Sequence, residues 1–232
     1  MIREKIKDAA NIQQPRLLLT MADYIALTKP RIVLLLLFTT LGAMVMADAG
    51  WPSWRLIIIA MAGGALSAGG AGAVNQSLDK DIDQLMARTR GRPVANYRVS
   101  PRSAMLYGLA LIAGGFALFA VGANLLSAML SLAGALFYIL VYTKWLKRNS
   151  TQNIVIGGAA GAIPPLVGWA AVTGSLALPA WYMFIIIFFW TPPHFWALSL
   201  LLKKDYEAAN VPMYPVVFGE AETQRMIFLY TV

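Results

Sequence analysis

Apolar runs of about 20 residues recur along this chain, and they restrict its fold more than any other feature of the sequence. Each run is long enough to cross the hydrocarbon core of a bilayer as an α-helix. Backbone amides find no water inside that core, so several such runs must satisfy their hydrogen bonds within helices. The composition agrees, because 59% of the residues are hydrophobic and 13% are charged. The sequence therefore predicts an all-α, polytopic bundle of transmembrane helices.

Six spans are predicted, and a seventh begins near Arg225. The six cover residues 31–47, 54–78, 103–122, 124–142, 153–174 and 178–202. They form one membrane domain, predicted at residues 23–232, after a tail at residues 1–22 that lacks the apolar core of a cleavable signal peptide. Because the chain stops shortly after the seventh span begins, we expect it to be truncated, with C-terminal spans missing.

The basic residues predict the orientation of these spans. Of the 19 Lys and Arg residues, all but Arg55 fall in the N-terminal tail or at alternate connections between spans. By the positive-inside rule, we expect the N-terminus and those connections to face the cytoplasm. We expect the membrane itself to be a bacterial inner membrane. A net charge of +8 could suggest a nucleic-acid partner. Because the charge is divided among short loops, we expect the lipid bilayer and no nucleic acid. The absence of cysteine excludes disulfides and thiol chemistry.

An acidic cluster, "NQSLDKDID", directly follows the second apolar run. Its Asn75, Asp79 and Asp83 are four residues apart, so on a helix they drift by about 80° in all and share one face. Asp81 falls roughly opposite and is expected to be solvated or to act indirectly. If Asp79 and Asp83 lie about 6 Å apart at an effective dielectric near 20, their repulsion is on the order of 3 kcal/mol. Something cationic should compensate for it.

The compensating cation is either a basic side chain or a metal ion. In the first case Lys80, Arg88 and Arg90 neutralise an ordinary solvated helix end. In the second case the amide and the two carboxylates that share a face bind Mg²⁺, which takes oxygen ligands and completes its shell with water and phosphate oxygens. Asn75, Asp79 and Asp83 are therefore the predicted metal ligands.

A cluster of arginines next to the acids favours the metal. The stretch "ARTRGRP" contains Arg88, Arg90 and Arg92. Arginine pairs with phosphate oxygens through its planar fork. Each arginine alone would more often anchor the helix or contact anionic lipid. Together with the carboxylates they predict a diphosphate site.

A second charged stretch follows the sixth span. "LLKKDYEAANVPMYPVVFG" ends in a proline-containing strip, as the first loop does, which suggests an internal repeat. Its acids, Asp205 and Glu207, are two residues apart and make a poor helical face for a metal. An ordinary charge cluster at a helix end is the alternative.

These stretches resemble the UbiA superfamily of membrane prenyltransferases. "NQSLDKDID" fits its Asn-x-x-x-Asp-x-x-x-Asp signature at Asn75, Asp79 and Asp83. Further blocks resemble the protohaem IX farnesyltransferase branch of that superfamily, in order along the chain from about Asp23. They are "LTKPRI", "DQLMARTRGRP", "YTKWLKR", "NIVIGGAAGAIPPLVGW", "TPPHFWALSL" and "DYEAANVPMYPVV". The chain departs from the superfamily around Asp205, where a full Asp-x-x-x-Asp is absent, and this puts a second metal ion in doubt.

The resemblance implies a fold and a reaction. The fold is a helical bundle around a cavity with its acidic loops on the cytoplasmic side. The reaction is Mg²⁺-dependent transfer of farnesyl from farnesyl diphosphate to a vinyl group of haem B, giving haem O and diphosphate. Family analogy also implies a downstream partner, a haem-A synthase or an oxidase-assembly protein.

The remaining candidate residues follow from the chemistry of an allylic diphosphate. As the carbon–oxygen bond ionises, cations held at the phosphate lower the barrier most. Arg88, Arg92 and Lys147 are the catalytic candidates; Arg90, Lys144, Lys203, Lys204 and Asp205 are expected to bind substrate. Aromatic rings can stabilise an allylic cation, although each is more often a packing residue. The aromatic candidates are Tyr142, Phe195, Trp196 and Tyr206. Asn153 contacts substrate or simply caps a helix.

His194 is the single histidine of the chain and lies inside the sixth span, after two prolines. Ionisable residues inside a membrane are often functional, and imidazole is a common axial haem ligand. The alternative is a neutral histidine that is hydrogen-bonded to a backbone carbonyl.

Two other functions fit parts of the pattern. A UbiA-type transferase acting on 4-hydroxybenzoate or a quinone precursor would share the diphosphate site. A transporter or channel would be expected to carry charges near the bilayer midplane. In this chain the acids gather at one membrane face, which disfavours a transporter.

Overall fold

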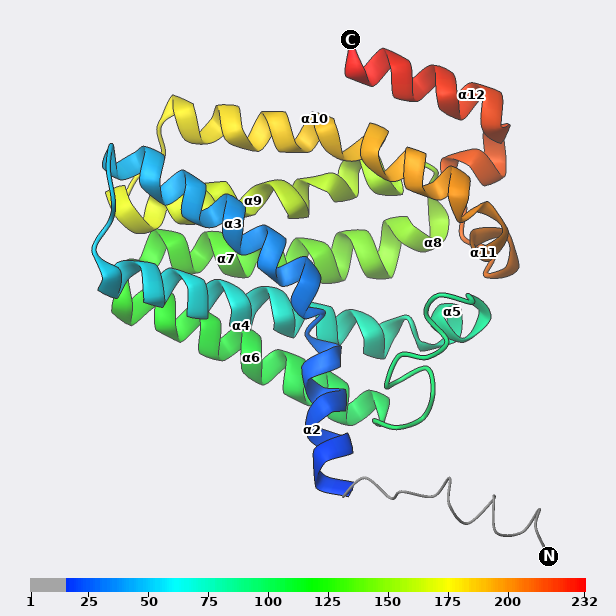
Figure 1. The fold of residues 1–232 in the computed structure, drawn as a ribbon, viewed down its shortest axis with the longest axis horizontal. Coiled ribbons are helices and arrows are strands. Elements are labelled where there is room, and N and C mark those ends of the chain that lie inside the picture. Colours follow the sequence, from blue (N-terminus) through cyan, green and yellow to red (C-terminus); the bar gives the residue numbers. More distant parts are fainter. Residues whose placement is uncertain (1–15) are drawn as a thin grey trace, which may run out of the picture.

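The computed structural model describes residues 16–232, and every regular element in that range is a helix. The chain begins with α2 (Arg16–Leu27), which runs at a steep angle to the long helices (Figure 1). The remaining elements are α3 (Pro30–Asp48), α4 (Trp54–Leu78), α5 (Lys80–Leu85), α6 (Pro101–Gly122), α7 (Leu125–Leu136), the π-helix η1 (Phe137–Leu146), α8 (Lys147–Asn149), α9 (Asn153–Thr173), α10 (Leu178–Leu201), α11 (Lys203–Ala208) and α12 (Tyr214–Thr231).

Six of these helices are long and apolar enough to cross a membrane, which confirms the predicted spans to within a few residues at most ends. The fourth span differs most. It was predicted to end at residue 142, but α7, η1 and α8 form one continuous span to Asn149. The last turns of that helix therefore carry Tyr142, Lys144 and Lys147, which were expected at its end or in the following loop.

Two helices form the interior of the bundle. The most apolar window of α4 is 56% buried and that of α9 is 61% buried, whereas the other four spans are 22% to 28% buried. Helix α4 packs closely on α6 because glycines face each other. A Cβ added at Gly70 would lie 2.5 Å from the carbonyl oxygen of Gly108. Small residues thus let two backbones approach, as in other membrane bundles.

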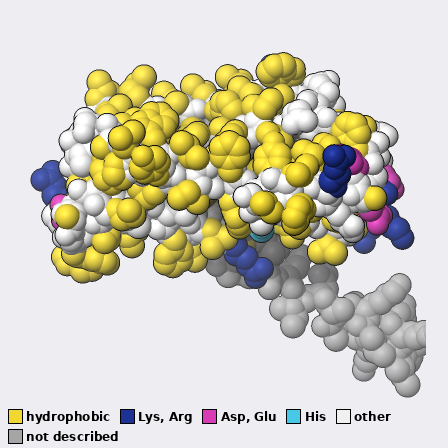
Figure 2. Space-filling model, turned by 90° about the horizontal axis from the view of Figure 1, so that it is seen from above, with side chains coloured by type: hydrophobic (Ala, Val, Ile, Leu, Met, Phe, Trp, Pro, Cys, Tyr) yellow, Lys and Arg dark blue, Asp and Glu magenta, His cyan; other side chains and the backbone are white. Residues whose placement is uncertain are grey.

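The outer surface is largely hydrophobic. Leu35, Ile58, Leu106 and Ile186 are among the large apolar side chains that are more than half exposed. In Figure 2 hydrophobic side chains cover the middle of the face, and charged ones lie mainly toward the ends of the long axis. Such a surface is stable in lipid and not in water. The chain is an integral membrane protein.

Helix α12 covers the residues at which the seventh span was predicted to begin. It begins at Tyr214, earlier than the predicted start near Arg225, and it is interrupted at Gly219, whose φ is 83°. It packs against α10 through contacts of Trp196 with Tyr214 and Tyr230. The predicted tail at residues 1–22 lies mostly outside the described residues, and its last part begins α2.

Candidate active site

The acidic signature lies where α4 meets α5. Helix α4 ends at Leu78 and α5 begins at Lys80, so the stretch is not one helix. Its register nevertheless continues, because Asp79 N donates to Asn75 O at 2.9 Å and Asp83 N donates to Asp79 O at 2.8 Å. Asn75, Asp79 and Asp83 are 3%, 0% and 1% exposed. The three side chains therefore share one buried face, as their spacing predicted.

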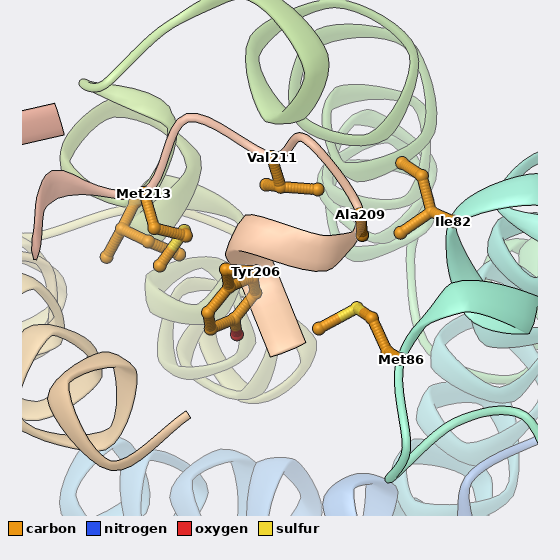
Figure 3. Packing of buried hydrophobic residues seen from close by; sticks show 7 residues of the cluster. Ile82, Met86, Tyr206, Ala209, Val211 and Met213 are labelled. Carbon is orange, nitrogen blue, oxygen red and sulfur yellow. The ribbon is translucent and has the colours of Figure 1, made fainter. Parts of the chain in front are cut away.

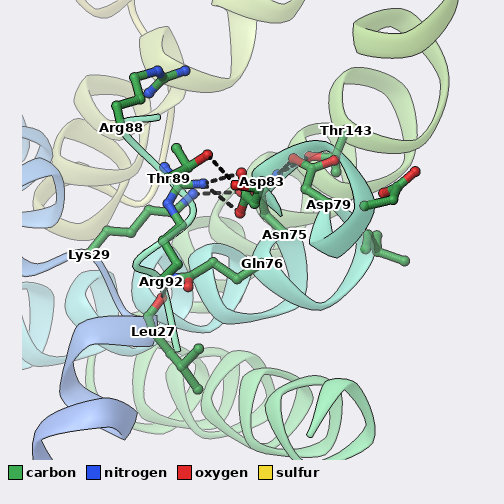
Figure 4. Close-up of polar contacts among 12 residues, drawn as sticks. Leu27, Lys29, Asn75, Gln76, Asp79, Asp83, Arg88, Thr89, Arg92 and Thr143 are labelled. Carbon is green, nitrogen blue, oxygen red and sulfur yellow. Dashed lines mark hydrogen bonds and ion pairs between the residues drawn. The ribbon is translucent and has the colours of Figure 1, made fainter. Parts of the chain in front are cut away.

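Asp79 is surrounded by donors from α4 and the fourth span (Figure 4). Its Oδ2 pairs with Lys147 Nζ and accepts a hydrogen bond from Asn75 Nδ2 at 2.7 Å. The same amide nitrogen donates to Thr143 Oγ1 at 3.0 Å. The other carboxylate oxygen, Oδ1, is buried and accepts no hydrogen bond, although a guanidinium nitrogen of Arg148 lies 3.6 Å from it. A buried oxygen without a donor is an open ligand position.

Asp83 is neutralised by one arginine of the predicted cluster. Arg92 Nη1 donates to both carboxylate oxygens of Asp83 at 2.8 Å. The Arg92 side chain is 25% exposed while that of Asp83 is 2% exposed, so the guanidinium remains accessible from the loop. Thr89 Oγ1 donates to the backbone carbonyl of Asp83 at 3.0 Å and fixes the loop.

Asp81 points away from this buried face, as predicted, and acts on it through Arg148. Both carboxylate oxygens of Asp81 bind Arg148, at 2.7 Å and 2.8 Å. Arg148 Nη2 also donates to the carbonyl of Leu78 at 2.9 Å. The Arg148 hydrogen bond lowers the pKa of Asp81 to about 2. Asp81 therefore holds Arg148 beside Asp79.

The π-helix η1 directs the fourth span toward the acids. Lys147 N bonds to Tyr142 O, five residues back, which is the widened spacing of a π-helix. Tyr138 and Thr143 of this segment contact Lys29 and Asn75, and Lys147, directly after it, contacts Asp79. These contact residues are spaced by four or five positions and face the same side of the widened helix. Such segments occur frequently at functional sites.

Lys29 is a site residue that sequence reasoning missed. Its Nζ donates to Asn75 Oδ1 at 2.6 Å and to the Tyr138 hydroxyl at 3.3 Å. Burial, together with the positive charges of Arg92 and Lys147, lowers the pKa of Lys29 to about 7. The sequence signal was the "LTKPRI" block, which was used only for the resemblance and for orientation. Thr143, Tyr138 and Arg148 were also missed, because their partners lie far away in sequence.

The second charged stretch packs on the first. Asp205 accepts hydrogen bonds from the backbone amides of Ala87 at 3.2 Å and Arg88 at 3.3 Å. Arg88 Nη2 donates to the Tyr206 hydroxyl at 3.1 Å. Apolar side chains also join the two stretches. Ile82 and Met86 of the first stretch pack with apolar residues of the second stretch, including Val211 and Met213 (Figure 3).

This packing explains the missing second signature. The residue four positions after Asp205 is Ala209, which is 7% exposed and belongs to the same apolar cluster. A carboxylate there would be buried without a partner and costly. Asp205 consequently bonds to the backbone of the first loop.

Several other predicted residues lie near this face or on its edge. Tyr142 stacks on Tyr138 with ring centroids 5.5 Å apart. Asn153 is 1% exposed, its Nδ2 lies 3.5 Å from Pro212 O, and its Oδ1 has no partner. Lys203 lies 3.5 Å from Glu220 and 3.9 Å from Glu207. Arg90, Lys144 and Lys204 are exposed.

The aromatic and histidine candidates of α10 are not brought into contact with the acids. Trp196 is 1% exposed and packs between Tyr214 and Tyr230, in keeping with the packing alternative. Phe195 is 39% exposed. His194 is exposed and stacks on Trp190 with centroids 4.3 Å apart. Within the described residues 16–232, His194 makes no hydrogen bond to a backbone carbonyl, and its haem role stays a prediction.

The donor set suits Mg²⁺. Within residues 16–232 no group of three or more His, Cys, Asp or Glu side chains could hold a metal ion. Two carboxylates and one amide do converge, however, and Mg²⁺ typically uses one or two carboxylates with water and phosphate oxygens. The buried, unpartnered Oδ1 of Asp79 supplies the open oxygen that such an ion requires.

Comparison with known proteins decides the family. A model of the UbiA prenyltransferase family matches residues 36–232. The chain belongs to the UbiA prenyltransferase family. Enzymes of this family transfer prenyl groups, so the chain is a prenyltransferase. It contains the buried Asn75, Asp79 and Asp83 described above.

Three similar relatives of this UbiA-family chain carry the same name. It is 52% identical over 231 residues to the protoheme IX farnesyltransferase of Gloeobacter violaceus, covering 100% of this chain and 76% of that protein. It is 54% identical over 210 residues to the one of Trichodesmium erythraeum, covering 90% of this chain and 64% of the relative. It is 55% identical over 213 residues to the protoheme IX farnesyltransferase of Thermus thermophilus, covering 92% of this chain and 35% of that protein.

Solved structures support the fold. A UbiA homolog from Archaeoglobus fulgidus bound to GPP and Mg²⁺ aligns with a TM-score of 0.76 at 17% identity, over 90% of this chain and 74% of that one. A digeranylgeranylglyceryl phosphate synthase aligns with a TM-score of 0.73 at 14% identity, over 91% and 73%. The all-α UbiA-type bundle predicted from the sequence is thereby confirmed.

Proposed function

We propose that this UbiA-family chain transfers the farnesyl group of farnesyl diphosphate to a vinyl group of haem B, giving haem O and diphosphate. The observation that carries the proposal is the 52% identity, over the whole chain, with a protein named for that reaction. The geometry supports the diphosphate half of the reaction, because two buried carboxylates and several cations converge at the α4–α5 junction.

The residues of this junction would bind and polarise the diphosphate. Asn75, Asp79 and Asp83 would hold Mg²⁺, whose charge stabilises the phosphate oxygens as they depart. Lys147 and Arg92 neutralise Asp79 and Asp83 and would also pair with phosphate oxygens. Arg88 would add a third cation from the edge, with Tyr206 holding its guanidinium. These groups lower the barrier because they are fixed before charge develops.

At the acceptor, the reaction forms one carbon–carbon bond and one carbon–oxygen bond to the haem vinyl group. The bond between C1 of farnesyl and the diphosphate oxygen breaks, and the electron pair leaves with the diphosphate. C1 then bonds to the terminal carbon of the haem vinyl group. Water adds its oxygen to the neighbouring carbon and loses one proton, which leaves a hydroxyethylfarnesyl substituent. Tyr142, stacked on Tyr138 near the acids, would present a ring face to the allylic cation.

The remaining predictions belong to the same proposal. The N-terminus, the loops that contain α5 and α11, and the α8 end of the fourth span would face the cytoplasm of a bacterial inner membrane, because basic residues gather there. The product would pass to a haem-A synthase or an oxidase-assembly protein, since a hydrophobic haem needs an acceptor in the membrane.

Analysis of the haem product tests the proposal. The purified chain in lipid vesicles is incubated with haem B, farnesyl diphosphate and Mg²⁺, and haems are separated by reversed-phase chromatography. A more hydrophobic haem, with the mass of one added farnesyl and one added hydroxyl group, is expected, and EDTA should abolish it. A parallel reaction offers 4-hydroxybenzoate as the acceptor. Prenylation of that acceptor with none of haem would overturn the proposal.

A further inference from the structure

Lys29 stands in an unusual backbone position. It separates α2 from α3, directly before Pro30, with φ 54° and ψ 60°. This left-handed conformation is uncommon for a residue with a side chain and costs free energy. A proline that follows makes helical backbone at the preceding residue still less favourable. Such strain persists only where the surroundings fix the conformation.

The surroundings of Lys29 do fix it. Gln76 of α4 is 1% exposed, and its Nε2 donates to the carbonyls of Ala26 at 3.3 Å and Leu27 at 3.1 Å. Two glycines of α4 let the corner approach. A Cβ at Gly69 would lie 2.9 Å from Thr28 Cβ, and one at Gly72 would lie 3.3 Å from Leu27 O. Helix α4 therefore holds the corner, and the corner turns the lysine toward Asn75.

The amine reaches the same oxygen that a metal ion would need. Lys29 Nζ lies 2.6 Å from Asn75 Oδ1, which is the amide oxygen of the acidic signature. The neighbouring nitrogen of that amide already donates to Asp79 and Thr143, so Oδ1 is the side on which a cation can bind. An ammonium and a divalent cation cannot both contact that oxygen, because like charges at such short range repel strongly.

We propose that Lys29 is a movable positioning cation, which occupies the metal side of Asn75 before loading and turns to the diphosphate once a divalent ion takes that oxygen. The inference rests on the proposed function. A lysine suits the role, because its ammonium is a compact charge on a flexible stem, whereas arginine would bind as a rigid fork. The Tyr138 hydroxyl, 3.3 Å from Nζ, gives the amine a second partner as it moves.

Binding measurements without any turnover test this inference. Lys29→Met keeps an unbranched side chain that is one atom shorter and removes its charge. Mn²⁺ binding to the protein in detergent is followed by electron paramagnetic resonance, first with the metal alone. We expect the variant to bind Mn²⁺ about fivefold or more tightly than the wild type, because the competing ammonium is gone. Inorganic diphosphate is then titrated into the Mn²⁺-loaded proteins, and we expect the variant to bind it about tenfold more weakly.

Lys80→Met is the matched control. Lys80 is five residues from Asn75 and carries the same charge, but its ammonium lies over the Tyr97 ring at 4.3 Å from the centroid. It should leave both affinities within about twofold of the wild type. If the wild type binds Mn²⁺ and Lys29→Met binds it no more tightly, the proposed role of Lys29 is overturned, while the metal site of the proposed function is not. A wild type that binds no Mn²⁺, with or without diphosphate, would instead contradict the metal site of the proposed function.

Discussion

Asp79 has the most demanding position of any side chain in the site. It is fully buried, it pairs with Lys147, and its Oδ1 has no donor. A carboxylate without a full set of donors is costly in a bilayer unless a bound cation completes it. Asn75 and Thr143 fix its direction through one amide. We therefore expect substitution of this side chain to affect the reaction more than substitution of the exposed arginines.

Asp79→Asn is therefore expected to lower haem O formation at least about 100-fold, because the neutral amide loses the metal and leaves Lys147 without its partner. The rate is measured by chromatography of haem products, and gel filtration checks that the variant remains folded. Asp48→Asn is the control, since Asp48 is exposed at the end of α3. Equal rates for the two variants would remove Asp79 from the reaction.

The two charged stretches form one structural unit. Asp205 at the start of α11 bonds to the backbone of Ala87 and Arg88, and Arg88 bonds to Tyr206 in return. Apolar side chains from both stretches pack underneath. The α11 segment thus supports the arginine loop, and we propose that its residues act on the diphosphate mainly by holding Arg88 in place.

Asp205→Asn should loosen this unit, because the substituted amide nitrogen cannot accept the bond from one of the two backbone amides. Losing one such hydrogen bond costs about 1 kcal/mol. Hydrogen exchange at Ala87 and Arg88, followed by mass spectrometry in detergent, should accelerate about fivefold. Glu207→Gln, on the exposed side of α11, is the control and should exchange normally. Unchanged exchange in Asp205→Asn would show that the hydrogen bonds from Asp205 to the first loop do not stabilise it.

The close contact of α4 with α6 gives a second prediction about the elements. In Gly70→Ala the new methyl would lie 2.5 Å from Gly108 O, so the helices must separate. The separation should destabilise the bundle by about 1 to 3 kcal/mol. In Gly114→Ala, the control on α6, the nearest atom would be 3.9 Å away. Thermal unfolding in detergent should show a lower midpoint for Gly70→Ala alone, and equal midpoints would contradict the contact.

The parts of the fold and of the site that depend on neighbouring residues in the sequence could be predicted. Apolar runs determined the six spans, because each must satisfy its backbone within lipid. The spacing of Asn75, Asp79 and Asp83 determined the shared face, since their i to i−4 bonds survive the break at Asp79. By contrast, Lys29 and Arg148 reach the site through the packing of distant helices. The π-helix also escaped prediction, because an apolar run gives no sign of a widened turn.

The distribution of charge predicts a topology that the chain is well suited to test, because it contains no cysteine. Single cysteines can be placed at Asn96, in the basic loop after α5, and at Ser175, between α9 and α10; both positions are exposed. If basic loops face the cytoplasm, a membrane-impermeant maleimide should label Ser175→Cys in intact cells. Asn96→Cys should be labelled only after permeabilisation. The reverse pattern would invert the orientation and place the proposed diphosphate site on the opposite side of the membrane.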